Sequence, residues 1–407
     1  MTGACLICAR PIDPFLSFGK MPIANGFLRA DEFAGEYFFE LKVAFCPCCH
    51  MVQLAELVEP ERMFHEHYAF FSSTSTYMAA HFARFAEWVR GTYLGDDDPF
   101  VVEIGSNDGI MLRHFAAAGM RHLGVEPSAN VAQIARERGV RTVSRFFDEA
   151  LAQTILAEHG MVDALLGANV MCHIPDLHGV FAGAKKLLKP RGVLAFEDPY
   201  LGDIVEKTAY DQIYDEHAFY FCCASISALA ARHDLEVIDV LPQPVHGGSM
   251  RYVLAHAGAH PVADAVRALR EKETRLGLAL PETYARLRTS IERSRDALRA
   301  LLTDLKHQGR RVVGYAATSK STTVTNYCGI TPELVEFISD TTPIKQGKYS
   351  PGAHIPVRPY EAFAARYPDY ALLFGWNHSA EIMAKEGAFK AAGGKWIVYV
   401  PTVQVLD

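Results

Sequence analysis

The chain has 407 residues, and because domains average roughly 150 residues, about two or three domains are expected. Half of the residues are apolar and 21% are charged, which excludes an intrinsically disordered chain. A formal net charge of −7 argues against a protein that mainly neutralises nucleic-acid phosphates. The sequence contains no long apolar run and its first residues lack the apolar stretch of a signal peptide. We therefore expect a cytoplasmic protein with a small-molecule partner, and neither a nucleic-acid nor a membrane partner.

Two Cys-x-x-Cys pairs lie near the N-terminus, Cys5-Leu-Ile-Cys8 and Cys46-Pro-Cys-Cys49. Four thiolates are the ligand set of a closed structural zinc site, so these four cysteines are predicted to bind one Zn²⁺. His50 could replace one sulfur, and the alternative without metal is four reduced, buried cysteines. Because four protein ligands leave no open position, the predicted zinc holds the fold together and takes no part in the chemistry. The zinc-binding module is predicted to span residues 1–66, with a short helix and turn over 60–68.

Residues 67–257 are predicted to form a domain with a mostly parallel sheet. Apolar residues recur at helical spacing over 77–93, which predicts an amphipathic helix at its start. Strand-like runs then alternate with helix-length segments, as in a doubly wound sheet. The strands are expected at 100–104, 122–125, 162–167, 192–196, 235–240 and 251–254, and the helices at 128–138, 148–159 and 176–188.

Residues 258–407 are predicted to form a helical linker and a second α/β domain. One apolar helical stripe, of the kind that most often packs between domains, consists of Leu276, Leu280, Leu287, Ile291, Leu298, Leu301 and Leu305. Strands are expected at 311–315, 334–338, 370–374 and 396–400, with helices starting near Ser319 and Asn377.

The segment Val-Val-Glu103-Ile-Gly105-Ser-Asn107-Asp-Gly109 is predicted to bind a cofactor, because it runs from a strand into a polar loop that opens a helix. Glycine at the strand end lets the backbone approach a ligand closely. Glu126, about twenty residues further on at the tip of the next strand, can accept both hydroxyls of a ribose. A nicotinamide dehydrogenase needs G-x-G-x-x-G, which this loop lacks, whereas class I S-adenosylmethionine-dependent methyltransferases have loops of this form. A merely tight turn is the third interpretation.

Two further residues follow later strands. Asp148 is a candidate partner for the adenine amino group. Asn169 ends the fourth strand, where open α/β sheets bind ligands, although a lone asparagine can also simply cap a turn. The predicted fold class is thus α/β: a class I methyltransferase Rossmann-like domain flanked by an N-terminal zinc-binding module and a C-terminal α/β domain.

The densest cluster of titratable groups is Tyr-Asp-Gln-Ile-Tyr214-Asp-Glu216-His217-Ala-Phe-Tyr. A carbon acceptor of a methyl group must first lose a proton, which requires a poised base and stabilisation of the enolate oxygen. His217 can be the base near neutral pH, Tyr214 can donate to the oxyanion, and Glu216 can orient or polarise a ring. Tyr214 stays open as an alternative base. A polar face of a surface helix is the alternative without function.

Other candidates for contact with substrate lie on loops. His173 and His246, the latter in a His-Gly-Gly loop, can reach a ligand, although each alone is more often structural. In the last domain the strand ending at Tyr315 leads into Ser319-Lys320-Ser321, which opens a helix. Such a terminus, with hydroxyls and one cation, suits a phosphate or pyrophosphate, or Ser319 simply caps the helix. Asn377 follows a later strand and is expected to border the same crevice.

The order of these motifs, from the paired cysteines through V-E-I-G-S-N-D-G, F-E-D-P-Y, Y-D-Q-I-Y-D-E-H and H-G-G to G-Y-x-A-x-x-K, resembles the nucleotide-sugar C-methyltransferases. The resemblance covers the whole chain and is strongest to the C-3 methyltransferases of dTDP-3-amino-4-keto-deoxysugars. It implies a zinc-containing N-terminal domain, a central domain for S-adenosylmethionine and a C-terminal domain that helps to hold thymidine diphosphate.

The resemblance also implies roles for individual residues. The family's Tyr-Asp-Glu-His motif maps onto residues 214–217, and its Cys-His motif onto Cys172 and His173. Its Tyr-x-x-x-Ser-Ser segment maps onto Tyr68, Ser72 and Ser73, which adds Tyr68 to the catalytic candidates. The family usually has glycine where this chain has Ala316, and the added methyl group could narrow the nucleotide crevice.

The predicted reaction is C-methylation of a dTDP-4-keto-deoxysugar, with C-3 favoured and C-5 as the alternative carbon. His217 would remove the proton alpha to the keto group, Tyr214 would stabilise the enolate, and the carbon would attack the S-methyl group. An O- or N-methyltransferase is the nearer rival, and a non-catalytic zinc and Rossmann binding module the more distant one. We expect a monomer or weak homo-oligomer.

Overall fold

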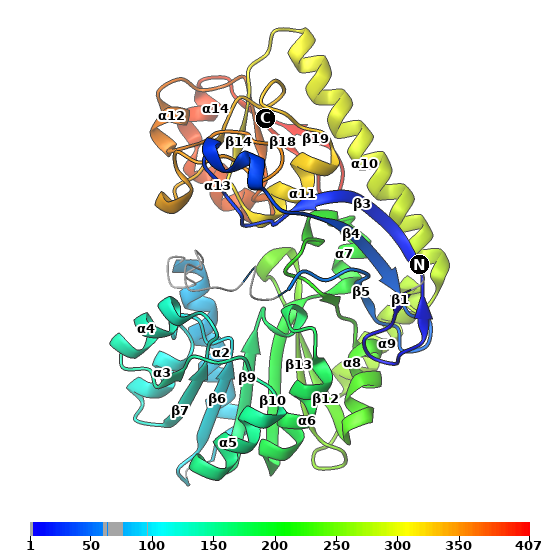
Figure 1. The fold of residues 1–407 in the computed structure, drawn as a ribbon, viewed down its shortest axis with the longest axis vertical. Helices are drawn as coiled ribbons and strands as arrows, with labels where there is room; N and C mark the ends of the chain where they lie inside the picture. The colour runs from blue at the N-terminus through cyan, green and yellow to red at the C-terminus, as the bar shows by residue number, and fades with distance from the viewer. Residues whose placement is uncertain (1–2, 60–62, 64–75, 96) are drawn as a thin grey trace.

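The computed structural model describes residues 3–59, 63, 76–95 and 97–407 (Figure 1). The helix and turn predicted over 60–68, and with them Tyr68, Ser72 and Ser73, lie outside the described residues. Among the helices that are described, none combines the length and the hydropathy needed to cross a bilayer.

The N-terminal part consists of a small hairpin and a sheet. Strands β1 (Gly3–Ala4) and β2 (Pro11–Ile12) pair antiparallel and enclose the first cysteine pair. The sheet has the order β11-β5-β4-β3, with β3 at Pro14–Pro22, β4 at Phe38–Phe45, β5 at Val52–Leu54 and β11 at Phe219–Tyr220. A 3₁₀ helix, η1 (Ala30–Gly35), connects β3 to β4. Because β11 comes from the segment predicted to carry the chemistry, the zinc-binding part and that segment share one sheet.

The central part is a seven-stranded sheet of order β12-β13-β10-β9-β6-β7-β8. Its strands are β6 (Phe100–Ile104), β7 (Arg121–Val125), β8 (Thr142–Val143), β9 (Val162–Ala168), β10 (Leu188–Pro199), β12 (Leu235–Gln243) and β13 (Ser249–His256). Strand β13 is antiparallel to both of its neighbours, β12 and β10. The other neighbouring pairs in this sheet are all parallel. All five residues of β6 are buried, as expected for a central parallel strand covered on both faces. The six strands predicted for this domain are confirmed, and the two-residue strands β8 and β11 were missed.

Helices flank this sheet. They are α2 (Thr76–Tyr93), α3 (Leu112–Ala117), α4 (Ala129–Glu137), α5 (Glu149–His159), α6 (Leu177–Leu187), α7 (Leu201–Lys207) and α8 (Cys223–Ala230), with 3₁₀ helices η3 (Met171–His173), η4 (Tyr210–Gln212), η5 (Ala231–His233) and η6 (Val245–Gly247). Helices α5 and α6 lie together on one face of the sheet (Figure 1).

The single helical stripe predicted for the linker is wrong, because two helices form. Helix α9 (Asp264–Leu276) ends at Gly277, whose φ of +70° favours glycine, and α10 (Pro281–His307) begins with proline at its first turn. Leu280 lies in the break and is 53% exposed, so it does not belong to the stripe. The long α10 runs from the C-terminal domain to the zinc-binding sheet, where Tyr284 stacks on Phe45 at 4.3 Å between ring centroids (Figure 1).

The C-terminal part is a six-stranded sheet of order β16-β15-β14-β17-β18-β19. Its strands are β14 (Val312–Tyr315), β15 (Ile338–Ser339), β16 (Val357–Arg358), β17 (Tyr370–Leu373), β18 (Lys395–Val398) and β19 (Gln404–Leu406), and its helices are α11 (Ser319–Tyr327), η7 (Pro343–Lys345), α12 (Tyr360–Ala364), η8 (Trp376–His378), α13 (Ser379–Lys385) and α14 (Gly387–Ala391). The strand predicted over 334–338 is largely wrong, because only Ile338 of that range belongs to a strand. The predicted α/β fold class is confirmed for both larger domains.

Candidate functional site

The four predicted zinc ligands converge. The Sγ atoms of Cys5 and Cys49 are 3.4 Å apart, as are those of Cys8 and Cys46, and all four lie within 4.8 Å of one another. The two turns match: the residue after each pair, Ala9 and His50, has a φ of +59°. Four sulfurs at these separations fit tetrahedral Zn²⁺ with Zn–S distances of about 2.3 Å. The His50 ring is therefore not needed as a ligand, and Cys48 is exposed to solvent.

A cavity of about 450 Å³ lies between the central and C-terminal sheets. Its walls come from the carboxyl ends of β6, β7 and β9, from the segment 212–217, and from the turn after β14. One residue of the N-terminal part, Asn25, also lines it. The crevice beyond the carboxyl ends of parallel strands is where open α/β sheets bind ligands.

Backbone geometry opens the cofactor end of this cavity. Gly105 has a φ of +64°, and a Cβ atom there would lie 2.6 Å from a methyl carbon of Val170, so a side chain cannot be accommodated. The Glu126 carboxylate, at the tip of β7, accepts from the backbone N–H groups of Asn107 at 3.0 Å and Ser128 at 2.8 Å. Burial raises the pKa of Glu126, while these donors lower it. Gly105, Asn107, Glu126 and Asn169 all line the cavity, and their binding of the cofactor stays a prediction.

Three of the residues predicted for the cofactor site, Glu103, Gly109 and Asp148, do not line the cavity. Glu103 is buried inside β6, where desolvation and the neighbouring Glu126 raise its pKa well above the usual range. Gly109 has a φ of +78° and packs against Val140, to which a Cβ would approach within 2.8 Å. Asp148 is the N-cap of α5 and accepts from Leu151 N at 2.6 Å. One oxygen of Asp148 is thus used by the helix cap, and its contact with adenine stays a prediction.

Motif analysis missed the apolar part of the cofactor end. Met78 and Phe82 of α2, and Phe146 and Phe147 before α5, line the cavity. Phe146 is 45% exposed, which is unusual for a phenylalanine and places an aromatic face at the cavity rim. The only sequence signal was the helical spacing of Met78 and Phe82, which reads equally well as core packing.

The segment predicted to carry the chemistry brings an imidazole and a phenol together. His217 Nε2 lies 2.9 Å from the Tyr214 hydroxyl, and His217 Nδ1 lies 2.8 Å from the carbonyl oxygen of Gln212. Because a carbonyl only accepts, Nδ1 carries the hydrogen and neutral His217 presents its lone pair at Nε2. Burial and the nearby His173 lower the pKa of His217 well below its usual value, so the ring stays neutral at physiological pH. The ring of His173 stacks on His217 at 5.2 Å between centroids, and burial lowers its pKa to about 4.

This segment is anchored to the C-terminal domain by a buried carboxylate. Asp211 accepts from Trp376 Nε1 at 2.6 Å and from the Tyr399 hydroxyl at 2.9 Å. The amide of Gln212 donates to the carbonyl oxygen of His246. The loop that carries His217 is therefore held between the two sheets, as a site at their junction requires.

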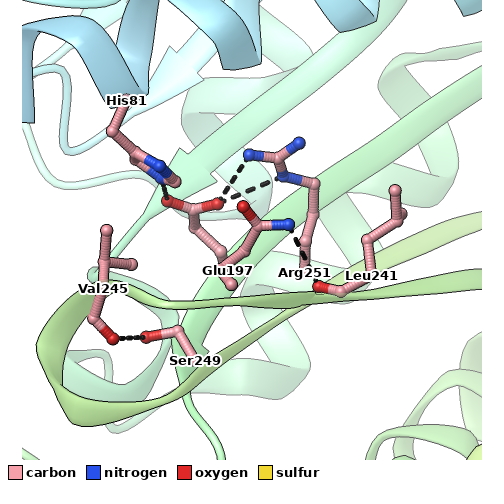
Figure 2. A network of polar contacts seen from close by, with 7 residues as sticks. His81, Glu197, Leu241, Val245, Ser249 and Arg251 are labelled. Atoms are coloured by element: carbon pink, nitrogen blue, oxygen red, sulfur yellow. Dashed lines mark hydrogen bonds and ion pairs between the residues drawn. The ribbon is translucent and has the colours of Figure 1, made fainter.

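His246 lines the cavity in a strained loop, as its place in the His-Gly-Gly motif suggested. Its φ is +54°, and burial together with the charge of Lys320 lowers its pKa to about 3. Figure 2 shows the buried network beside this loop, in which Glu197 of β10 bonds to His81 of α2 and to Arg251 of β13. The Arg251 guanidinium also lies 3.5 Å from the ring centroid of Phe85. The network ties α2 to the sheet next to the cavity.

The C-terminal wall carries two cations, the buried Lys320 and the partly buried Lys345. Lys320 Nζ donates to the carbonyl of His246 and to Asn377 Oδ1, both at 3.3 Å, and Lys345 Nζ donates to the carbonyl of Ala317 at 2.7 Å. Both line the cavity, and burial lowers the pKa of both. An anion in the cavity would offset that desolvation. No sequence motif indicated Lys345, which lies on η7.

The remaining residues predicted for substrate contact divide in two groups. Ser319 and Asn377 line the cavity. Ser321 instead donates to the carbonyl of Thr318, which is the N-cap of α11 in place of the predicted Ser319. Tyr315 points into the core of its own domain and donates to Glu386 at 2.8 Å, so the structure does not support a contact with substrate.

Strand alternation explains the orientation of Tyr315, since successive side chains face opposite sides. The next residue, Ala316, lines the cavity with a φ of +71°, a conformation that favours the glycine usual in the resembling family.

Three family models match the chain: "Putative zinc binding domain" over residues 5–64, "Methyltransferase domain" over 64–240 and "C-methyltransferase C-terminal domain" over 244–401. The C-methyltransferase NovU of Streptomyces niveus is 36% identical over 409 residues, covering 99% of this chain and 96% of that protein. The order of the three models is the order of domains in the structure.

Two solved methyltransferase structures each resemble less than half of the chain. Magnesium protoporphyrin IX methyltransferase (ChlM) from Synechocystis PCC 6803 with bound SAM is 13% identical with a TM-score of 0.33, over 44% of this chain and 79% of that chain. The CcbJ methyltransferase from Streptomyces caelestis is 14% identical with a TM-score of 0.33, over 44% and 90%. By its full-length similarity and its three matched domains, the chain belongs to the S-adenosylmethionine-dependent C-methyltransferases with an N-terminal four-cysteine zinc-binding domain.

Proposed function

We propose that this enzyme methylates a carbon of a dTDP-4-keto-deoxysugar, C-3 being favoured, by removal of the proton alpha to the keto group. The observation that carries the proposal is the His217–Tyr214 pair in the cavity between the two α/β domains. A base with a fixed tautomer beside a phenol donor suits enolisation of a ketone. An O- or N-methyltransferase would have no need of an oxyanion donor at this position.

His217 acts as the base through Nε2. When a keto oxygen enters the cavity, the Tyr214 hydroxyl can donate to it, which leaves the Nε2 lone pair for the alpha proton. The electron pair of the C–H bond then resides in the enolate, and the enolate carbon forms the new C–C bond. The bond from sulfur to the methyl carbon breaks, and S-adenosylhomocysteine leaves with its electron pair.

The cofactor end of the cavity would hold the methyl donor. S-adenosylmethionine, when bound, supplies an electrophilic methyl group on a sulfonium. We place its ribose at Glu126, its adenine near Phe146, and its backbone contacts at Gly105 and Asn169, which all line one end of the cavity.

The opposite end holds the nucleotide. Lys320 and Lys345 can contribute positive charge toward a dianionic diphosphate, because their described hydrogen-bond acceptors are the uncharged carbonyl and amide oxygens of His246, Ala317 and Asn377. The carboxylates of Asp211, Asp340 and Glu216 lie near enough to raise the pKa of one or the other lysine. Ser319, at the start of α11, adds a hydroxyl and the helix N-terminus adds backbone N–H groups. The net charge of −7 makes this attraction local to the cavity.

The substrate is tested by incubating the enzyme with S-adenosylmethionine and a small panel of dTDP-keto-deoxysugars, followed by mass spectrometry and NMR of the products. We expect a carbon-bound methyl group at C-3. A methyl group at C-5 would correct the position only, whereas a methyl group on oxygen or nitrogen would refute the proposed chemistry.

Replacing Glu126 with glutamine is expected to raise the Kd for S-adenosylmethionine by about 10- to 100-fold, because a charge-assisted hydrogen bond contributes about 1.5–3 kcal/mol. Isothermal calorimetry measures the change. Glu137→Gln, an exposed position on α4, is the matched control and should bind as wild type. Equal affinities for all three proteins would place the ribose elsewhere.

Replacing either Lys320 or Lys345 with methionine is expected to raise KM for the nucleotide sugar by about 10- to 100-fold with little change in the Kd for S-adenosylmethionine, because each variant removes one charge from the diphosphate end. Steady-state kinetics measure this split, and the exposed Lys390→Met serves as control. An unchanged KM in both variants would rule out a diphosphate at this wall.

A further inference from the structure

The turn after β3 brings the zinc-binding domain into the cavity region. The backbone N–H of Ala24 donates to Asp215 Oδ1 at 2.9 Å, and its carbonyl accepts from Thr322 Oγ1 of α11 at 2.8 Å. One residue of the zinc-binding domain is thus bonded both to the segment that carries His217 and to the C-terminal domain.

The next residue reaches the cavity itself. Asn25 Nδ2 donates to Glu216 Oε1 at 2.6 Å, and both side chains line the cavity. Glu216 is only 5% exposed, so its carboxylate depends on protein donors for its charge and orientation. Burial raises the pKa of Glu216, and the Asn25 amide and the charge of Lys345 lower it. The adjacent Asp215 carboxyl is also buried, and burial together with the charge of Glu216 raises its pKa to about 8.

The cysteine cluster connects the two parts of the N-terminal domain that contact the segment 215–220, namely residues 24–25 and strand β5. Strand β3, which leads to Asn25, pairs with β4, and β4 ends directly before Cys46. Strand β5 follows Cys49 and pairs with β11, while Leu54 N donates to the carbonyl of Ala218 at 2.9 Å. The segment is therefore held from two sides by strands that the cysteines join.

We propose that Asn25 is a positioning residue for the methyl transfer, supplied by the zinc-binding domain, which holds the Glu216 carboxylate ionised and aimed into the cavity. The inference rests on the proposed function and adds to it that the Glu216 carboxylate, which lines the same cavity as His217, accepts a hydrogen bond from the substrate. It assigns the N-terminal domain a part in the active site beyond its structural zinc.

The experiment uses the full-length enzyme with the variants Asn25→Leu, Asn25→Ser and Glu216→Gln. Lys20→Gln is the control, because Lys20 is exposed and lies on β3, the strand that precedes Asn25. Zinc content is measured for each protein, so a variant that loses the metal is recognised. Protein labelled with ¹³C at the glutamate carboxyl carbon is titrated by NMR, with the Glu216 signal assigned by its absence in Glu216→Gln.

We expect the Glu216 titration midpoint to rise by about one pH unit in Asn25→Leu, because loss of the donor destabilises the carboxylate, and to rise less in Asn25→Ser. We expect kcat to fall at least tenfold, with the acid limb of its pH profile moving to higher pH. Asn25→Leu should add little to Glu216→Gln, because both act through one carboxylate.

An unchanged midpoint in zinc-replete Asn25→Leu and Asn25→Ser would overturn the inference. The inference would also fail if the Glu216 midpoint moved but kcat and its pH profile, measured with a sugar that the wild-type enzyme methylates, stayed as in wild type. Because the titration needs no substrate, it tests the contact even if the dTDP-sugar panel gives no product, an outcome that would count against the proposed function alone.

Discussion

Replacing His217 with asparagine is expected to lower kcat by about 10²- to 10⁴-fold, the usual contribution of a positioned general base. The Nδ1 atom is held by the Gln212 carbonyl and Nε2 faces Tyr214, so His217 has one basic atom and it points at the proposed reaction site. Asparagine retains the polarity and much of the size but cannot take a proton. Affinity for S-adenosylmethionine, measured by calorimetry, should stay near that of wild type.

The same variant tests the base directly in heavy water. With a dTDP-4-keto sugar, wild-type enzyme should exchange the alpha hydrogen for deuterium, and His217→Asn should not. Tyr214→Phe separates the two candidate bases: it should slow the reaction yet retain some exchange if Tyr214 stabilises the enolate. His159→Asn, an exposed histidine on α5, is the control. Exchange by His217→Asn at the wild-type rate would show that another group is the base.

Loss of one zinc ligand is expected to have the largest effect on stability. Structural Zn²⁺ in zinc-finger peptides contributes about 10–16 kcal/mol of apparent binding free energy to folding. Cys46→Ser should therefore bind less than one zinc per chain, unfold at a clearly lower temperature and lose activity, because β4, β5 and β11 meet at this knuckle. Elemental analysis and thermal unfolding measure the two effects.

Cys48→Ser is the matched control, because Cys48 lies in the same turn but is exposed and outside the cluster. It should keep its zinc and its unfolding temperature. Native enzyme without zinc, or equal behaviour of the two serine variants, would contradict the four-cysteine site.

Local patterns were sufficient for most of the fold. The apolar run of β6 and the apolar periodicity of α2 predicted these two elements correctly. The reason is that the pattern of apolar residues along a strand or helix reflects which of its faces are buried. The errors lie where local signal is weak. The two-residue strand β15 has too few residues to show a period, and the break before Pro281 lies within an otherwise continuous stripe.

The site divides in the same way. Residue type and spacing were enough to single out the zinc ligands, the loop with Gly105 and the cluster around His217. Asp148 and Tyr315 were assigned from strand ends alone, and which direction a side chain takes there depends on capping and strand register. Lys345 was missed because it lies in an irregular segment that reaches the cavity only through packing of the C-terminal sheet.

The sequence by itself therefore indicated a zinc-binding part, a methyltransferase part and a C-terminal α/β part in that order, the four-cysteine zinc site and the methyltransferase activity. Only the tertiary structure decided the tautomer of His217, the placement of Lys320 and Lys345 in the lining of one cavity, and the approach of Asn25 to Glu216. The physical reason is range: motif chemistry and periodicity are local, whereas these contacts join residues far apart in the chain, whose meeting depends on how the domains pack.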